Sequence, residues 1–109
     1  MKKQNMISNH DLVLNKIPNP DDKSSDYLET WEKFALTMNA YKVCGDSAFE
    51  LAGKVLKNPL NASLTELRCA LFVLQRQHRW NEPYSDPDDE RVTQLLKLIR
   101  DKVEKGELE

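Results

Sequence analysis

The sequence has little of several residue types that assign a chain to a specialised class. It holds three glycines, two cysteines and two histidines in 109 residues, and no apolar run is long enough to cross a membrane. The glycines are isolated, so phosphate-binding loops of the Walker or dinucleotide type are absent. The cysteines and histidines do not have the close paired spacing of metal ligands. We therefore expect no metal, no cofactor and no membrane span.

Charge and the start of the chain limit the partners and the compartment. Sixteen basic and eighteen acidic residues give a net charge of −2, which is too near zero to indicate a nucleic acid or a membrane surface. The residues after Met1 do not form the apolar core of a secretory signal. We therefore expect a cytoplasmic protein. In that reducing compartment Cys44 and Cys69 should remain thiols rather than form a disulfide.

Helical periodicity predicts an all-α fold, a compact bundle of about four helices behind a loosely ordered N-terminal arm. Residues 1–25 lack a helical stripe and are expected to be a flexible arm with a short ordered piece near Asp11–Ile17. Residues 26–106 form the expected helical domain, and residues 107–109 are a tail.

The first two expected helices are bounded by capping and stop signals. The first runs from Asp26, which has Glu29 three residues later, to Gly45, a residue that readily adopts the left-handed conformation at a helix end. The second begins after Asp46 or Ser47 with a Ser-x-x-Glu box and ends before Pro59. Its apolar face is expected to contain Phe49, Ala52, Val55 and Leu56.

The third and fourth expected helices have the clearest patterns. Ser63 and Glu66 form a capping box before an apolar run, residues 69–74, which favours a central helix over the competing interpretation of a buried strand. The fourth helix is expected to start at Asp86, with Pro87 at its first position, and to end at Gly106. Its apolar stripe is Val92, Leu95, Leu96, Ile99 and Val103.

The third helix carries more apolar surface than one neighbour can cover. Leu71 continues the core-facing seam, and Phe72 and Val73 follow it at steps of about 100° around the helix. At least one of them is therefore expected to be partly exposed, and we expect this flank to contact another protein or a second copy of the chain.

A basic and aromatic cluster at the end of the same helix has two interpretations. Its side chains could stack on bases and pair with phosphates, or its arginines could pair with the acidic residues at 86–90 and tie two helices together. A helix-turn-helix is disfavoured because the helix that would enter the groove starts with apolar and acidic residues. The expected partner-binding residues are Arg68, Phe72, Val73, Arg76, Arg79 and Trp80.

Three function hypotheses remain at this point. The favoured one is a small non-enzymatic cytosolic protein that binds another macromolecule, by analogy with inhibitor, immunity or adaptor proteins. The alternative is a nucleic-acid-binding accessory protein that uses Arg68, Arg76, Arg79 and Trp80. The third is a small enzyme with Cys44 as nucleophile, which requires a basic partner that the fold would have to bring close.

Overall fold

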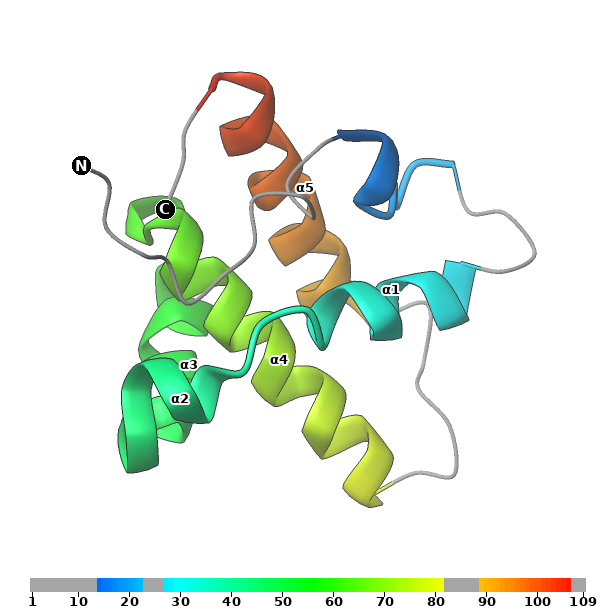
Figure 1. Ribbon diagram of the computed structural model, residues 1–109. Helices are drawn as coiled ribbons and strands as arrows, with labels where there is room; N and C mark the ends of the chain where they lie inside the picture. The colour runs from blue at the N-terminus through cyan, green and yellow to red at the C-terminus, as the bar shows by residue number, and fades with distance from the viewer. Residues whose placement is uncertain (1–13, 23–26, 82–88, 107–109) are drawn as a thin grey trace.

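The computed structural model describes residues 14–22, 27–81 and 89–106, and within these ranges the chain is helical with no strand (Figure 1). The all-α prediction is confirmed. The α-helices are α1 (Tyr27–Ala35), α2 (Ala40–Cys44), α3 (Ala48–Lys57), α4 (Leu64–Asn81) and α5 (Glu90–Glu104). Short 3-10 helices occur at η2 (Leu14–Lys16), η3 (Gly45–Ser47) and η4 (Pro59–Asn61).

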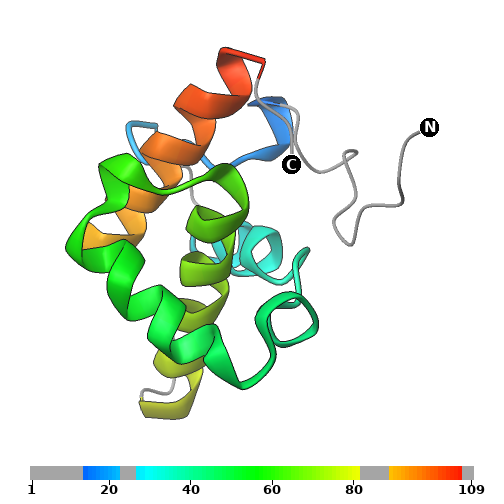
Figure 2. The same cartoon turned by 90° about the vertical axis from the view of Figure 1, so that its left-hand side faces the viewer.

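Helix α4 is the centre of the fold, as the sequence predicts. The predicted capping box is present: the Ser63 backbone N–H donates to Glu66 Oε1 at 2.9 Å, and the Glu66 N–H donates to Ser63 Oγ at 3.1 Å. Residues 67–75 are all buried, because α1, α2, α3 and α5 each pack against α4. Figures 1 and 2 show these helices arranged around α4 on different sides.

The expected first helix is wrong in its extent, because the chain turns after α1 and starts α2 at Ala40. Thr37 Oγ1 donates to the Phe34 carbonyl at 2.6 Å in this turn. The Asn39 side chain then accepts hydrogen bonds from the N–H groups of Tyr41 and Lys42, at 3.0 and 3.4 Å. Asn39 is therefore an N-cap, a role that its residue type favours.

Helix α3 ends as expected but does not start as expected. Gly45 has a φ of 63°, which suits the predicted stop, and leads into η3. Ser47 is already in helical backbone geometry and its side chain makes no cap hydrogen bond, so the predicted Ser-x-x-Glu box is wrong. The helix ends at Lys57, before Pro59.

Helix α5 begins later than the sequence suggests. Asp89 is its N-cap, and its carboxylate accepts from the Arg91 N–H at 2.8 Å, so the predicted start at Asp86 is wrong. Asp86 and Pro87 lie outside the described residues. The predicted stripe is confirmed: Val92, Leu95, Leu96 and Ile99 are buried, and Val103 packs against the core.

Residues 14–22 pack against α5, and η2 falls within the short ordered piece that the sequence predicts near Asp11–Ile17. Ile17 belongs to the core and is 3% exposed. Arg100 Nη1 donates to the carbonyls of Leu14 and Ile17, at 3.1 and 2.7 Å. Lys97 pairs with Asp21 at 3.3 Å. Residues 1–13 of the arm and the tail 107–109 lie outside the described residues.

Candidate functional site

Arg68, one of the expected partner-binding residues, is buried inside the fold. Its side chain is 2% exposed, and its Nη2 donates to Thr37 Oγ1 at 2.6 Å. The guanidinium also lies over the ring of Phe34, 5.4 Å from the centroid, in a cation–π arrangement. Arg68 therefore joins α4 to the turn after α1, and the expectation that it lies on a binding surface is wrong.

The expected exposure of Phe72 or Val73 is also wrong. Phe72 is 6% exposed and Val73 is 1% exposed. The ring of Tyr41, in α2, covers Phe72 edge-to-face, with centroids 5.3 Å apart and planes at 87°. The physical reason is the break before α2, because a single straight helix from Asp26 to Gly45 would not have turned back over this flank of α4.

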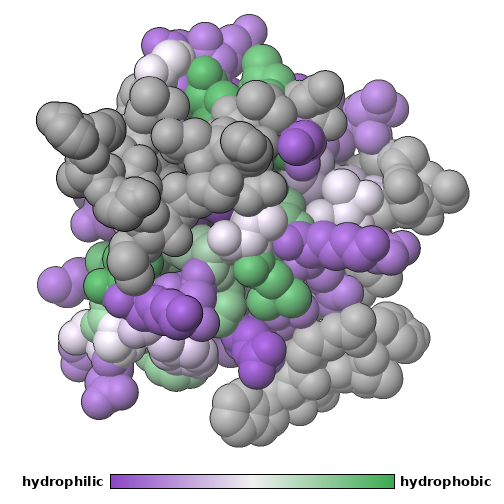
Figure 3. Space-filling view, in the orientation of Figure 1, coloured by the Kyte–Doolittle hydropathy of each residue, from purple (hydrophilic) through white to green (hydrophobic). Residues whose placement is uncertain are grey.

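Two exposed aromatic residues lie one layer further out and form what we call the aromatic face: Tyr41 of α2 and Phe49 of α3. The aliphatic residues Leu36, Val43 and Leu60 are exposed as well. The rings of Tyr41 and Phe49 are 6.0 Å apart at 51°, and the two residues are 39% and 45% exposed. Figure 3 shows apolar side chains among hydrophilic ones over the lower left of the molecule, where α2 lies in Figure 1. An aromatic series therefore runs from buried Phe72 through Tyr41 to Phe49 at the surface.

Sequence reasoning missed the aromatic face because it placed Tyr41 inside one long first helix and Phe49 on the apolar face of the second. The available signal was Asn39, a strong N-cap residue in what was interpreted as a helix interior. The chain neighbours Lys42, Asp46 and Glu50 are exposed, so charges of both signs border the face.

The basic end of α4 is only partly described. Arg76 is exposed, while the side chains of Arg79 and Trp80 lie outside the described residues although α4 spans them. Among the acidic residues expected to pair with this end, Asp89 forms an ion pair with Arg91 at 2.9 Å. The hydrogen bond from the Arg91 side chain to Asp89 raises the pKa of Arg91 above its ordinary value.

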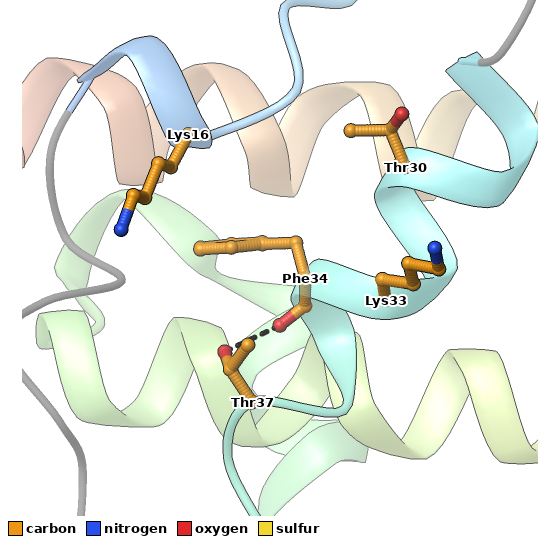
Figure 4. A pocket seen from close by; sticks show the side chains of 5 residues that line it. All are labelled: Lys16, Thr30, Lys33, Phe34 and Thr37. Atoms are coloured by element: carbon orange, nitrogen blue, oxygen red, sulfur yellow. Dashed lines mark hydrogen bonds between the residues drawn. The ribbon is translucent and has the colours of Figure 1, made fainter.

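A solvent-open hollow of about 230 Å³ lies between η2 and α1 (Figure 4). Its lining is Lys16, Thr30, Lys33, Phe34 and Thr37. The ammonium of Lys33 pairs with Glu29 at 3.0 Å, and the Thr37 hydroxyl is used by Arg68 and Phe34. The hollow presents positive charge, but two of its polar groups are already engaged within the protein.

Three sulfur atoms gather where α2 meets α4. Cys44 Sγ and Cys69 Sγ are 3.5 Å apart, and Cys69 Sγ is 3.5 Å from Met38 Sδ. Cys69 is a core residue and is 0% exposed, whereas Cys44 is partly exposed. The proximity of the two cysteines was missed, because residues 25 apart in sequence can be brought together only by the fold.

The described residues contain neither a cluster of metal ligands nor a membrane-spanning helix. In these parts of the chain no three His, Cys, Asp or Glu side chains lie close enough together to hold a metal ion. Likewise, none of the helices described there combines the length and apolar character needed to cross a membrane.

No protein-family model, no curated protein and no solved structure matches the chain. Its function is therefore inferred from its own geometry.

Proposed function

We propose that this is a non-enzymatic cytoplasmic protein that binds another protein through the aromatic face. The observation that carries the proposal is the exposed ring pair of Tyr41 and Phe49, 6.0 Å apart and each about two-fifths exposed. Tyr and Phe are enriched in protein interfaces because they bury large areas with few rotatable bonds. An inhibitor, immunity or adaptor role is consistent with such a surface.

The surroundings of the face support this function because they hold its rings in position. Tyr41 is held from below by buried Phe72, and the helix that carries it is capped by Asn39. Little side-chain entropy is lost when a partner covers a ring that is already positioned. Lys42, Asp46 and Glu50 would form the polar rim that usually surrounds an apolar interface centre.

The nucleic-acid alternative has no comparable support. Of the four side chains that it requires, Arg68 is buried against Phe34 and Thr37. Arg76 is the one whose exposed side chain is described. The described part of this patch therefore offers one exposed cation, whereas a groove that tracks a phosphate backbone needs several.

Site-specific photo-crosslinking tests the proposed function. A benzophenone amino acid replaces Phe49 in the full chain, and the matched control carries it at Leu60, a 73% exposed apolar residue in η4. We expect one discrete protein adduct from position 49. An excess of the unmodified chain should abolish this adduct, and an excess of the Tyr41→Ser chain should leave it in place. Loss of Tyr41 should weaken competition by about 10-fold or more, as for an interface anchor.

The adduct's mass and sequence separate the outcomes. A single foreign protein supports the proposal directly, and a dimer of this chain supports it with a second copy as the partner. Equal adducts from positions 49 and 60, or equal competition by both competitor chains, would overturn it. A nucleic acid adduct at position 49 would replace it with the alternative.

A further inference from the structure

The two cysteines of the chain form a pair across the contact between α2 and α4. Cys44 is the last residue of α2, and Cys69 lies in the buried part of α4. Their Sγ atoms are 3.5 Å apart, so they must approach by about 1.5 Å to reach the bond length of a disulfide. A change of this size lies within the range of small side-chain torsions and a slight shift of the short helix α2.

Because the two thiols differ in exposure, we expect one of them to react before the other. Cys44 is the partly exposed member of the pair, so we expect an oxidant in solution to react there first. Cys69 is 0% exposed and lies between Cys44 and Met38, which shields it from direct attack. An exposed attacking thiol beside a second thiol that can resolve the product is the arrangement of a redox-responsive cysteine pair.

We propose that Cys44 and Cys69 are an oxidative modification site that forms a reversible internal disulfide, with a low-molecular-weight disulfide such as oxidised glutathione as the oxidant. The Cys44 thiolate attacks one sulfur of oxidised glutathione, and the S–S bond breaks. The first glutathione leaves as a thiolate, which takes up the proton that Cys44 lost. The product is a mixed disulfide on Cys44.

The second step closes the pair. The Cys69 thiol loses its proton and attacks Cys44 Sγ, the Cys44–glutathione bond breaks, and the second glutathione leaves and is protonated. In total the two cysteine thiols lose two electrons and two protons, and one oxidised glutathione becomes two reduced molecules. Excess reduced glutathione reverses both steps.

The bond would fix α2 to α4 close to the aromatic face. Phe72 follows Cys69 by one helical turn on α4, and Tyr41, which covers Phe72, precedes Cys44 by three residues on α2. Oxidation therefore locks the helix that carries Tyr41. The disulfide does not depend on the proposed binding function, because it rests on the sulfur atoms alone.

Equilibration of the purified full chain in glutathione buffers tests the proposal. Samples are quenched with acid, unfolded in denaturant so that Cys69 becomes accessible, and blocked with N-ethylmaleimide. Their intact masses are then measured. We expect conversion from a doubly alkylated chain to an unalkylated chain that has lost two hydrogens. The converted fraction should follow the ratio of oxidised glutathione to the square of reduced glutathione. The oxidised chain should unfold on the order of 10 °C higher, because the link constrains the unfolded chain.

Single substitutions serve as matched controls. Cys69→Ala, an apolar replacement at a buried position, should stop at the mixed disulfide on Cys44. Cys44→Ser should leave Cys69 unmodified while the chain is folded, and circular dichroism checks that both variants retain their helices. A wild-type chain that accumulates only the mixed disulfide, forms only intermolecular disulfides or does not react would overturn the proposal. If Cys69→Ala loses its helices, the proposal is tested on the wild type by rapid-quench mass measurements. The mixed disulfide on Cys44 must then appear before the internal disulfide.

Discussion

Arg68 of α4 donates a hydrogen bond to the hydroxyl of Thr37, 2.6 Å away in the turn that separates α1 from α2. The Thr37 hydroxyl in turn donates a hydrogen bond to the Phe34 carbonyl at 2.6 Å. A buried guanidinium is thereby tied to the segment that redirects the chain. This turn allows α2 to cover Phe72, so the position of the aromatic face depends on a hydrogen bond beneath it.

Replacing Thr37 by valine should lower the free energy of unfolding by about 1–3 kcal/mol, because it removes an acceptor from a buried charged group. Urea unfolding monitored by circular dichroism measures the loss. Thr93→Val in α5 is the matched control, since it makes the same change at a half-buried position and should cost much less. Equal losses in the two variants would mean that the Arg68–Thr37 bond contributes nothing specific.

The cap of α4 should be worth about 1 kcal/mol, so Ser63→Ala should lower stability by that amount. The side chain of Ser63 accepts from the Glu66 N–H, whereas that of Ser47 makes no cap hydrogen bond at the start of α3. Ser47→Ala is therefore the control and should be nearly neutral. A cost at Ser47 as large as that at Ser63 would contradict the capping pattern described above.

The segment before α1 should contribute to stability through Ile17, which is 3% exposed. Ile17→Ala should cost about 2–4 kcal/mol, as expected for truncating a buried branched side chain. The exposed neighbour Lys16 provides the control, because Lys16→Ala should change the thermal midpoint very little. A neutral Ile17→Ala variant would indicate that the segment does not pack against α5 in solution.

Two phenylalanine substitutions should separate core from surface. Phe72→Glu should abolish the cooperative unfolding transition, since it places an unpaired charge in a position that is 6% exposed. Phe49→Glu should keep the helical circular dichroism and the transition, because Phe49 is 45% exposed. The spectra of both variants are measured under the same conditions. If the Phe49→Glu variant is unfolded, the Phe49 ring lies in the core.

Local signals predicted much of the fold and almost none of the candidate site. The capping box at Ser63 and Glu66 and the apolar run after it fixed α4, because both act within one or two turns of the helix. One contact that holds the turn after α1, from Arg68 to Thr37, joins residues 31 positions apart in sequence. Propensity in a local window does not include such a contact.

The same reason explains the misplaced binding surface. The sequence did show more apolar residues around Phe72 than one neighbouring helix can cover. Helix α2 covers them, but the sequence pattern predicted α1 and α2 as one longer helix. Likewise, the Cys44–Cys69 pair arises from the packing of α2 on α4, and no spacing rule relates residues that far apart. The cysteine pair therefore follows from tertiary contacts alone, whereas the start of α2 also had a local signal in Asn39.

The hydrogen bonds of Arg100 to Leu14 and Ile17 join residues separated by 86 and 83 positions. During synthesis the segment at 14–17 emerges long before α5 exists, and at about 5–20 residues per second the wait is on the order of ten seconds. Helices α1, α2 and α3 all precede α4 along the chain, so α4 can pack against them before α5 is made. The side of α4 that receives α5, and the contacts of Arg100 with residues 14–17, can therefore be completed only after α5 has been made.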